Sequence, residues 1–259
     1  MPSSHYNGFS LVELSIVLVI LGLLTGGILV GQSLIRVAEL RSVTADMSRY
    51  LSAFHAFRDR YMAAPGDMTN ATQFWGSVTS DGASCPNGLG TGTHTCDGNG
   101  NNRLDTSDGV YYEGTRFWQH LANAGLIEGS YTGVVGTSPR FVIGENHPAG
   151  KLSNTAFRAT AFGGATYGTG YTVVWGPQTN AGIGFFFGYG ASATGPALAP
   201  QEAWNIDAKL DDGKPDFGTV QGGGENANSA CYTAFPSPGD YNLTDSNVLC
   251  ALTFTLARR

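Results

Sequence analysis

The feature that most constrains this chain is an apolar segment of membrane length, residues 9–30, that contains one carboxylate, Glu13. Apart from Glu13, its only polar side chains are three hydroxyls. As a helix, twenty-two residues extend about 33 Å, which matches the hydrocarbon core of a bilayer. A secretory signal peptide would be shorter and would follow a basic segment, whereas residues 1–8 contain neither Lys nor Arg. The segment is therefore predicted to span a membrane, where an isolated carboxylate is costly and by default functional.

A helical pattern continues beyond this segment. Apolar residues recur at intervals of mostly three and four from Leu34 to Tyr61, which is the period of an amphipathic helix. The sequence AAPGD at 63–67 ends the pattern, because Pro and Gly interrupt helices. One helix is therefore predicted over 9–62, and its outer half needs other parts of the chain to cover its apolar stripe.

The rest of the chain is acidic and poor in charge. Residues 62–259 contain sixteen acidic and nine basic residues, whereas residues 1–61 contain four and five. Because nucleic-acid binding requires clustered cations, it is disfavoured for this part of the chain. Only 13% of all residues are charged and 37 are Gly, a composition typical of a loop-rich, β-containing extracytoplasmic protein rather than a cytosolic enzyme.

The four cysteines fall into two local pairs. None has CxxC spacing, and no His lies at zinc-finger distance from two of them, so a zinc site is disfavoured. An even count with local spacing predicts the disulfides Cys85–Cys96 and Cys231–Cys250 and an oxidising compartment. The alternative is four buried free thiols.

The chain is predicted to be α+β, with the long N-terminal helix packed on a mainly antiparallel β-sheet head that has long loops. A Gly- and Asn-rich loop occupies 76–110, and no repeat or linker divides the head. Short helices are expected at 115–127 and 200–210, and strands at 140–144, 157–163, 171–176, 182–190 and 248–256.

The start of the apolar segment carries a further pattern, Gly8-Phe9-Ser10-Leu11-Val12-Glu13 followed by LSIVLVILGLL. It resembles the prepilin signal shared by type IV pilins and type II secretion pseudopilins, and the resemblance covers residues 1–65. In that family a membrane prepilin peptidase cuts after the glycine and methylates the new N-terminus. The resemblance implies cleavage between Gly8 and Phe9, N-methylation of Phe9, and pairing of Glu13 with the Phe9 amine of a neighbouring subunit. Only assembly supplies that second charge, and opposite charges attract strongly in a low dielectric.

The resemblance divides the chain into a cleaved leader (1–8), a transmembrane half-helix (9–30), an amphipathic half-helix (31–64) and a globular head (65–259). It implies a single-pass protein of the bacterial inner membrane with its head outside the cytoplasm, which then enters a periplasmic pseudopilus or an extracellular pilus. The positive-inside rule alone favours the opposite orientation, because the arginines lie at 36–60. The resemblance and the cysteines favour the head outside.

Glycines stand in the segment where many pilins have a proline. Each glycine could loosen the helix on assembly, at about 1 kcal/mol relative to alanine. Alternatively, small residues allow close packing of helices. The residues are Gly22, Gly26, Gly27 and Gly31.

A second informative stretch is DGNGNNRLDTSD, residues 97–108. Oxygen ligands recur there with the spacing by which an EF-hand loop wraps calcium, and the pattern looks like the dockerin variant, which also ends in Asp. Asn102 stands where glycine is usual, but Asn tolerates the positive φ of that position. The alternative is a solvated turn. The candidate ligands are Asp97, Asn99, Asn101, the Arg103 carbonyl, Asp105 and Asp108.

A weaker calcium candidate lies at 205–218, NIDAKLDDGKPDFG. Its DxKxDDGxP pattern is similar to one in many large pilin-like proteins, and pseudopilins often hold calcium in a loop of the C-terminal half. The residues themselves favour a short helix that ends near Asp212, followed by a turn with solvated carboxylates. The candidate ligands are Asp207, Asp211, Asp212 and Asp216.

Catalytic motifs are missing from the sequence. It contains no HExxH, GxSxG or GxxxxGK[ST], and its five histidines are scattered. We therefore expect a structural subunit of a type IV pilus-like filament or a type II secretion pseudopilus rather than an enzyme. Its expected partners are other subunits, the prepilin peptidase and the membrane, and calcium is the candidate cofactor. The alternative is a monomeric, membrane-anchored module for calcium-dependent adhesion or binding.

Overall fold

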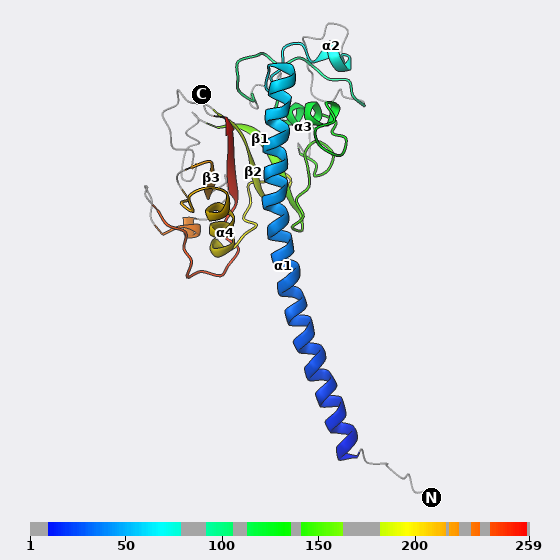
Figure 1. The fold of residues 1–259 in the computed structure, drawn as a ribbon, viewed down its shortest axis with the longest axis vertical. Coiled ribbons are helices and arrows are strands. Elements are labelled where there is room, and N and C mark those ends of the chain that lie inside the picture. The colour runs from blue at the N-terminus through cyan, green and yellow to red at the C-terminus, as the bar shows by residue number, and fades with distance from the viewer. Residues whose placement is uncertain are drawn as a thin grey trace, which may run out of the picture. The chain divides into compact units, whose positions relative to one another are not determined.

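The structure is a computed structural model that describes residues 10–78, 92–105, 113–135, 141–162, 182–215, 218–222, 229–233 and 239–257. It divides the chain into two compact units, residues 1–42 and residues 43–259. Helix α1, Leu11–Tyr61, contributes to both (Figure 1). The helix predicted over 9–62 is therefore confirmed from Leu11 to Tyr61.

In the first unit, α1 presents an apolar surface that nothing in the described chain covers. Every large apolar side chain from Leu11 to Ile35 is at least half exposed. By length and composition, α1 is a helix that could cross a membrane. A Cβ added at any of its four glycines would meet no other atom within 4 Å. No contact within the described chain therefore requires glycine at these positions.

In the second unit, the outer part of α1 packs on the head through a buried aromatic and aliphatic stripe. The ring of Tyr50 lies 4.9 Å from Trp118, 5.1 Å from Phe157 and 6.1 Å from Phe185. Leu51, one of the recurring apolar residues between Leu34 and Tyr61 that were expected on the stripe, is exposed. The buried apolar residues of α1 are Val43, Met47, Tyr50, Ala53, Phe54 and Phe57.

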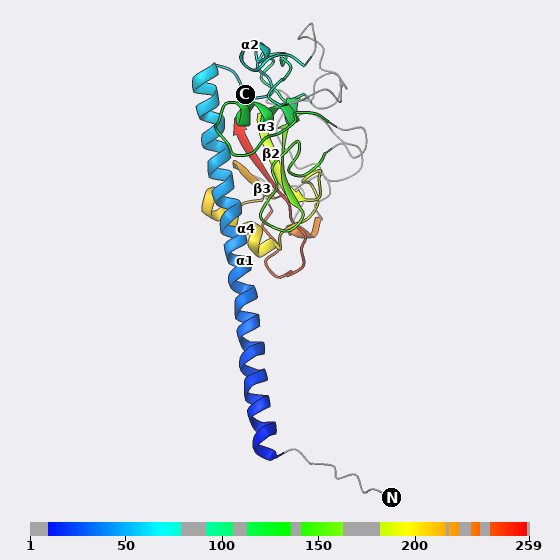
Figure 2. The ribbon, with the colours of Figure 1, turned by 90° about the vertical axis from the view of Figure 1, so that its right-hand side faces the viewer.

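The sheet of the second unit is antiparallel, in the order β1-β2-β4-β3, and lies beside the part of α1 that belongs to this unit (Figure 2). Its strands are β1, Thr155–Phe162; β2, Gly182–Tyr189; β3, Val220–Gly222; and β4, Leu252–Ala257. The α+β class predicted from the sequence is confirmed.

Three consecutive phenylalanines on β2 build the core on both faces of the sheet. Phe185 and Phe187 lie on the face that bears Phe157, at ring distances of 5.9 and 4.9 Å. Phe186 points to the opposite face, into a smaller cluster with Ala156 and Ala193. All three side chains are therefore used for packing, because successive residues of a strand alternate between faces.

Both short helices predicted for the head are present, although the one predicted at 115–127 begins two residues earlier and ends four residues earlier. Helix α3 spans Glu113–Asn123, and Gly125 stops it with φ of 70° while Leu126 N–H donates to the Leu121 carbonyl at 3.0 Å. Helix α4 spans Pro200–Leu210 as predicted. Helix α2, Thr72–Trp75, has only one turn and was not predicted.

Two strand assignments need correction. The strand predicted at 140–144 is wrong, because residues 141–144 lead into a turn whose contact is an isolated bridge between Ile143 and His147. Strand β3 has three residues and was not predicted. The strand predicted at 171–176 lies outside the described residues.

Candidate functional sites

The first candidate site is the start of α1, where the Glu13 side chain accepts a hydrogen bond from the backbone of Ser10. Glu13 Oε2 accepts a hydrogen bond from Ser10 N–H at 2.9 Å, and Ser10 Oγ accepts one from Val12 N–H at 3.3 Å. Glu13, the third helical residue, thus makes one half of a capping box, whereas the Ser10 hydroxyl caps the N–H of the second helical residue, Val12. Gly8 and Phe9, the predicted cleavage residues, lie outside the described residues.

Glu13 has no basic side chain near it in its own helix. The first Lys or Arg along the sequence is Arg36, about 34 Å away along a helix. Its neighbours Val12 and Leu14 are exposed apolar residues. In a bilayer, the carboxylate would therefore have a backbone N–H as its partner from this segment, and no opposite charge.

The second candidate site is the loop predicted to bind calcium, and its middle residues converge. Asp105 Oδ2 accepts hydrogen bonds from the side-chain amides of Asn99 and Asn101, both at 2.7 Å. Asn102 has φ of 62°, as the sixth position of an EF-hand-type loop requires. Three of the predicted ligands, Asn99, Asn101 and Asp105, therefore lie together.

The ends of this loop differ from the predicted arrangement of ligands. Asp97 accepts hydrogen bonds from Thr72 N–H at 2.8 Å and from the Thr72 hydroxyl at 3.1 Å, one on each oxygen. Its carboxylate thus holds the first residue of α2. Asp108 lies outside the described residues, and no contact of the Arg103 carbonyl defines its role.

Two buried carboxylates that the sequence did not reveal hold the loop from inside. Asp67 and Glu113 are 4% and 2% exposed, and both oxygens of each accept backbone N–H groups of residues 99–105 at 2.7–3.1 Å. Burial raises the pKa of Glu113 to about 8, opposed by these hydrogen bonds and reinforced by the negative charges of Asp67 and Asp105. Burial likewise raises the pKa of Asp67.

Close backbone packing brings these groups together. A Cβ on Gly98 would lie 2.5 Å from the Cα and carbonyl carbon of Asp67, so only glycine fits. The carboxylates of Asp67, Asp105 and Glu113 form no ion pair with the described residues, so a cation would relieve their mutual repulsion. Carboxylate and amide oxygens are suitable ligands for calcium.

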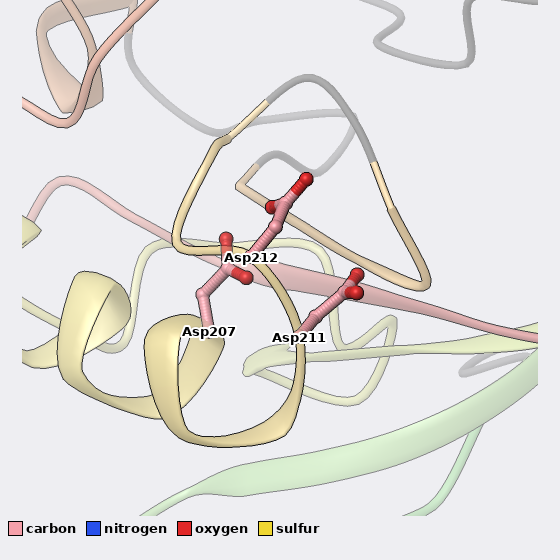
Figure 3. Close-up of side chains that lie close together, drawn as sticks. All are labelled: Asp207, Asp211 and Asp212. Carbon is pink, nitrogen blue, oxygen red and sulfur yellow. The ribbon is translucent and has the colours of Figure 1, made fainter.

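The third candidate site is the acidic turn after α4 (Figure 3). Oxygen atoms of Asp207, Asp211 and Asp212 lie within 4.8 Å of one another. Asp207 is fully buried and accepts hydrogen bonds from the Tyr241 hydroxyl at 2.8 Å and from Gly213 N–H at 3.1 Å. Burial raises its pKa to about 7.

The two exposed carboxylates of this turn also have structural roles. Asp211 Oδ2 accepts N–H groups of Thr219 and Val220, and Asp212 Oδ1 accepts Lys214 N–H at 2.9 Å. These bonds agree with the interpretation of the sequence as a short helix followed by a turn, whereas the carboxylate of Asp207 is buried and not solvated as expected. Asp216 lies outside the described residues.

One predicted disulfide is present in the described part of the chain. Cys231 and Cys250 are bonded and fully buried, and they join the last residue of the 3-10 helix Ser229–Cys231 to the segment just before β4. Cys96 is buried and disulfide-bonded, whereas Cys85 lies outside the described residues.

Comparison with known protein families gives a match at the start of α1. Residues 3–29 match the family described as the prokaryotic N-terminal methylation motif, the signature of type IV pilins and pseudopilins. No curated protein and no solved structure matches the chain. The long apolar helix followed by a small antiparallel sheet is an α+β pilin-like layout. The motif supports a precursor of pilin or pseudopilin type that prepilin peptidase processes, a class that is in general structural.

Proposed function

We propose that this protein is a structural subunit that is cut between Gly8 and Phe9, N-methylated at Phe9 and assembled through α1. Its destination is a type IV pilus-like filament or a type II secretion pseudopilus. Before assembly, residues 9–30 anchor it in the inner membrane with the head outside the cytoplasm. The observation that carries the proposal is the methylation motif over residues 3–29, placed on a helix whose apolar surface is exposed from Leu11 to Ile35.

The charge on Glu13 supports assembly rather than simple anchoring. An ionised carboxylate in hydrocarbon is costly unless it is paired, and α1 offers it no cation. Cleavage after Gly8 creates an amine on the residue four positions before Glu13. The same amine on a neighbouring subunit supplies the missing positive charge only when subunits come together.

Processing is tested by mass spectrometry of the mature chain from its native membrane. We expect the first residue to be N-methylated Phe9. An intact Met1, or a cut at another position, would end the pilin-type proposal.

Assembly is tested with Glu13→Ala. The variant should remain in the membrane but fail to enter filaments, measured by the fraction of processed chain recovered in sheared or pelleted filaments. Glu39→Gln is the control, because Glu39 lies on the same helix in a surface pair with Arg36 at 3.6 Å, a type of contact that contributes little. Normal incorporation of Glu13→Ala would show that the charge is irrelevant.

We also propose that the loop at 97–105 binds calcium, with Asn99, Asn101 and Asp105 as ligands beside Asp67 and Glu113. The support is the contact of Asp105 with the side-chain amides of Asn99 and Asn101, in a loop whose backbone N–H groups the buried carboxylates of Asp67 and Glu113 accept. A head that lacks residues 1–33 retains every buried residue of α1, which begin at Val43. Its melting temperature should rise with calcium, since a ligand at 100 times its Kd adds about 2.7 kcal/mol.

The control for calcium separates this loop from general charge effects. Asp105→Asn should abolish the rise in melting temperature, whereas Asp59→Asn, an exposed position on α1, should retain it. Equal melting temperatures of the wild-type head in chelator and in millimolar calcium would exclude the loop as a calcium site.

The alternative function, a monomeric calcium-dependent adhesion module, keeps the loop but needs neither Glu13 nor a free Phe9 amine. The Glu13→Ala experiment therefore separates the two functions. A variant that is excluded from filaments supports assembly, whether or not the head binds calcium.

A further inference from the structure

An aromatic and apolar patch is exposed where α1 ends. Met62, the residue after α1, is 88% exposed, and Phe74 on α2 is 55% exposed. The ring of Tyr61 lies 5.2 Å from Phe74 and 5.5 Å from Trp75, and both Tyr61 and Trp75 are half-buried. The four side chains therefore form one surface, which we call the distal patch. Exposed apolar surface of this kind commonly marks a binding site.

A second exposed apolar surface lies on the segment before β4. Leu243 is 47% exposed and Val248 is 52% exposed. Backbone hydrogen bonds hold this segment on the head, since Leu249 N–H donates to the Leu198 carbonyl at 3.0 Å. We call residues 242–249 the proximal loop.

Within the second unit, these two surfaces lie at opposite ends of the head (Figures 1 and 2). Both views show α2 beside the last turn of α1, and the segment before β4 at the end where α1 enters the unit. From Val43, its first buried residue, to Tyr61, α1 rises about 27 Å. Two unlike ends of one head can contact each other only between different molecules.

The two ends also differ in charge. The guanidinium of Arg60, in the last turn of α1, lies 5.1 Å from the ring centre of Tyr61, at the edge of the distal patch. By contrast, residues 239–257, which include the proximal loop, contain two acids, Asp240 and Asp245, and no Lys or Arg. Asp245 forms no ion pair with the described residues. Complementary charges across an interface favour one partner and one register.

We propose that the distal patch of one subunit docks on the proximal loop of a second copy of this chain, so that heads stack end to end in the filament. This inference rests on the proposed function, because assembly through α1 has to bring the heads together. The contact removes apolar side chains of both ends from water and brings Arg60 near Asp245. Since every subunit carries both surfaces, the contact is heterologous and repeats without closing.

The contact is tested by cross-linking the full-length chain in sheared filaments. Met62→Cys and Val248→Cys are combined in one chain and treated with a short bismaleimide, with which the described native cysteines do not react because they are disulfide-bonded. We expect a ladder of oligomers that grows by one subunit per step, because each chain is linked at both ends. Either variant alone should give no ladder. Met62→Cys with Leu51→Cys, an exposed position midway along the head part of α1, is the matched control pair and should give none.

The second measurement is incorporation into filaments in the native host, expressed per processed chain. Met62→Asp should incorporate roughly tenfold less, because it no longer buries an apolar side chain at the contact. Met62→Leu should match wild type. Because Met62 is exposed in the single subunit, neither variant should change the thermal unfolding of the full-length chain in detergent. Normal incorporation of Met62→Asp, or filaments without a ladder, would overturn the stacking contact.

These outcomes distinguish the stacking contact from the proposed function. If the processed chain enters filaments but gives no ladder, the proposed function stands and the contact falls. If the mature chain does not begin at Phe9 or enters no filaments, the proposed function falls and the contact falls with it. A third outcome concerns lipid as the occupant of the proximal loop. An environment-sensitive dye on Val248→Cys whose emission shifts to the blue in phospholipid nanodiscs, but not in filaments, would assign this loop to the membrane surface and overturn the contact.

Discussion

His120 makes the stability of the head sensitive to acid. The side chain is fully buried on α3, where Nδ1 accepts Gly66 N–H at 3.0 Å and Nε2 lies 2.9 Å from the Thr95 hydroxyl. Because Nδ1 must be an acceptor for Gly66, the ring has to be neutral, and Nε2–H donates to Thr95. Burial, together with the positive charge of Arg116, lowers the pKa of His120 to about 3.

The magnitude follows from the difference between the folded and unfolded pKa values. In the unfolded chain the His120 ring has a pKa near 6.5. Below this pH the unfolded state therefore binds a proton, whereas the folded state does not until the pH approaches 3. The stability contributed by neutral His120 is therefore complete above pH 6.5 and is lost as the pH falls toward 3. Between pH 7.5 and pH 5 the free energy of unfolding should fall by about 2 kcal/mol through this residue.

The buried carboxyl groups of Glu113 and Asp207 change the free energy of unfolding with pH in the opposite direction. The contribution of His120 must therefore be isolated by comparison with a variant. The folded pKa of Glu113 is raised to about 8 and that of Asp207 to about 7. Both groups therefore stabilise the fold increasingly as the pH falls through these values. Their contributions cancel when wild type is compared with His120→Gln, whose amide replaces one donor or acceptor but does not titrate.

The assay is urea unfolding of the head that lacks residues 1–33, at pH 7.5, 6 and 5. The difference in unfolding free energy, wild type minus His120→Gln, should fall by about 2 kcal/mol from pH 7.5 to pH 5. His55→Gln, at an exposed position on α1, is the matched control and should give a constant difference. A constant difference for His120→Gln as well would refute the assignment of a neutral, buried ring.

Three further predictions concern the head. Gly98→Ala should cost about 1–3 kcal/mol in urea unfolding, because its Cβ would overlap the backbone of Asp67; an unchanged unfolding midpoint would contradict the close packing. Tyr241→Phe should cost about 1–3 kcal/mol, and more at pH 8 than at pH 5. The lost hydroxyl raises the pKa of Asp207 further, so equal losses at both pH values would count against the bond. Replacing both Cys231 and Cys250 by Ala should lower the free energy of unfolding by about 3 kcal/mol, because the unfolded chain gains the entropy of the opened loop. A melting temperature equal to that of wild type would contradict a stabilising disulfide.

The elements that could be predicted from the sequence are those with local causes. Helix α4 was predicted with its observed bounds because Pro200 starts it and the Asp212-Gly213 pair follows it. Gly125 stops α3 as expected. Strand β3 could not be found, since its three residues are a strand only through pairing with β4, far along the sequence. The segment at 141–144 has β-type residues, but a turn closes it locally.

The candidate calcium loop shows the same limit: contacts within the loop could be predicted from the sequence, but contacts with distant residues could not. That Asn99, Asn101 and Asp105 lie together could be predicted, because their spacing is local and their side chains meet within one loop. Asp67 and Glu113 were missed, because an acid after a Pro-Gly turn and an acid at a helix start have ordinary explanations. Only the folded chain brings them to the inner side of the loop.

Glu113 and Glu13, two of the acids that form no ion pair with the described residues, differ in the partners that their carboxyl groups have. Glu113 is buried, but both its oxygens accept backbone N–H groups, and its raised pKa means that it can also take up a proton near neutral pH. Both oxygens of Glu113 therefore have hydrogen-bond donors within one subunit. Glu13 receives one backbone N–H on one oxygen and no opposite charge from its helix. Because a carboxylate in hydrocarbon requires more than this, the incomplete set of partners around Glu13 is itself an argument that the subunit functions with a neighbour.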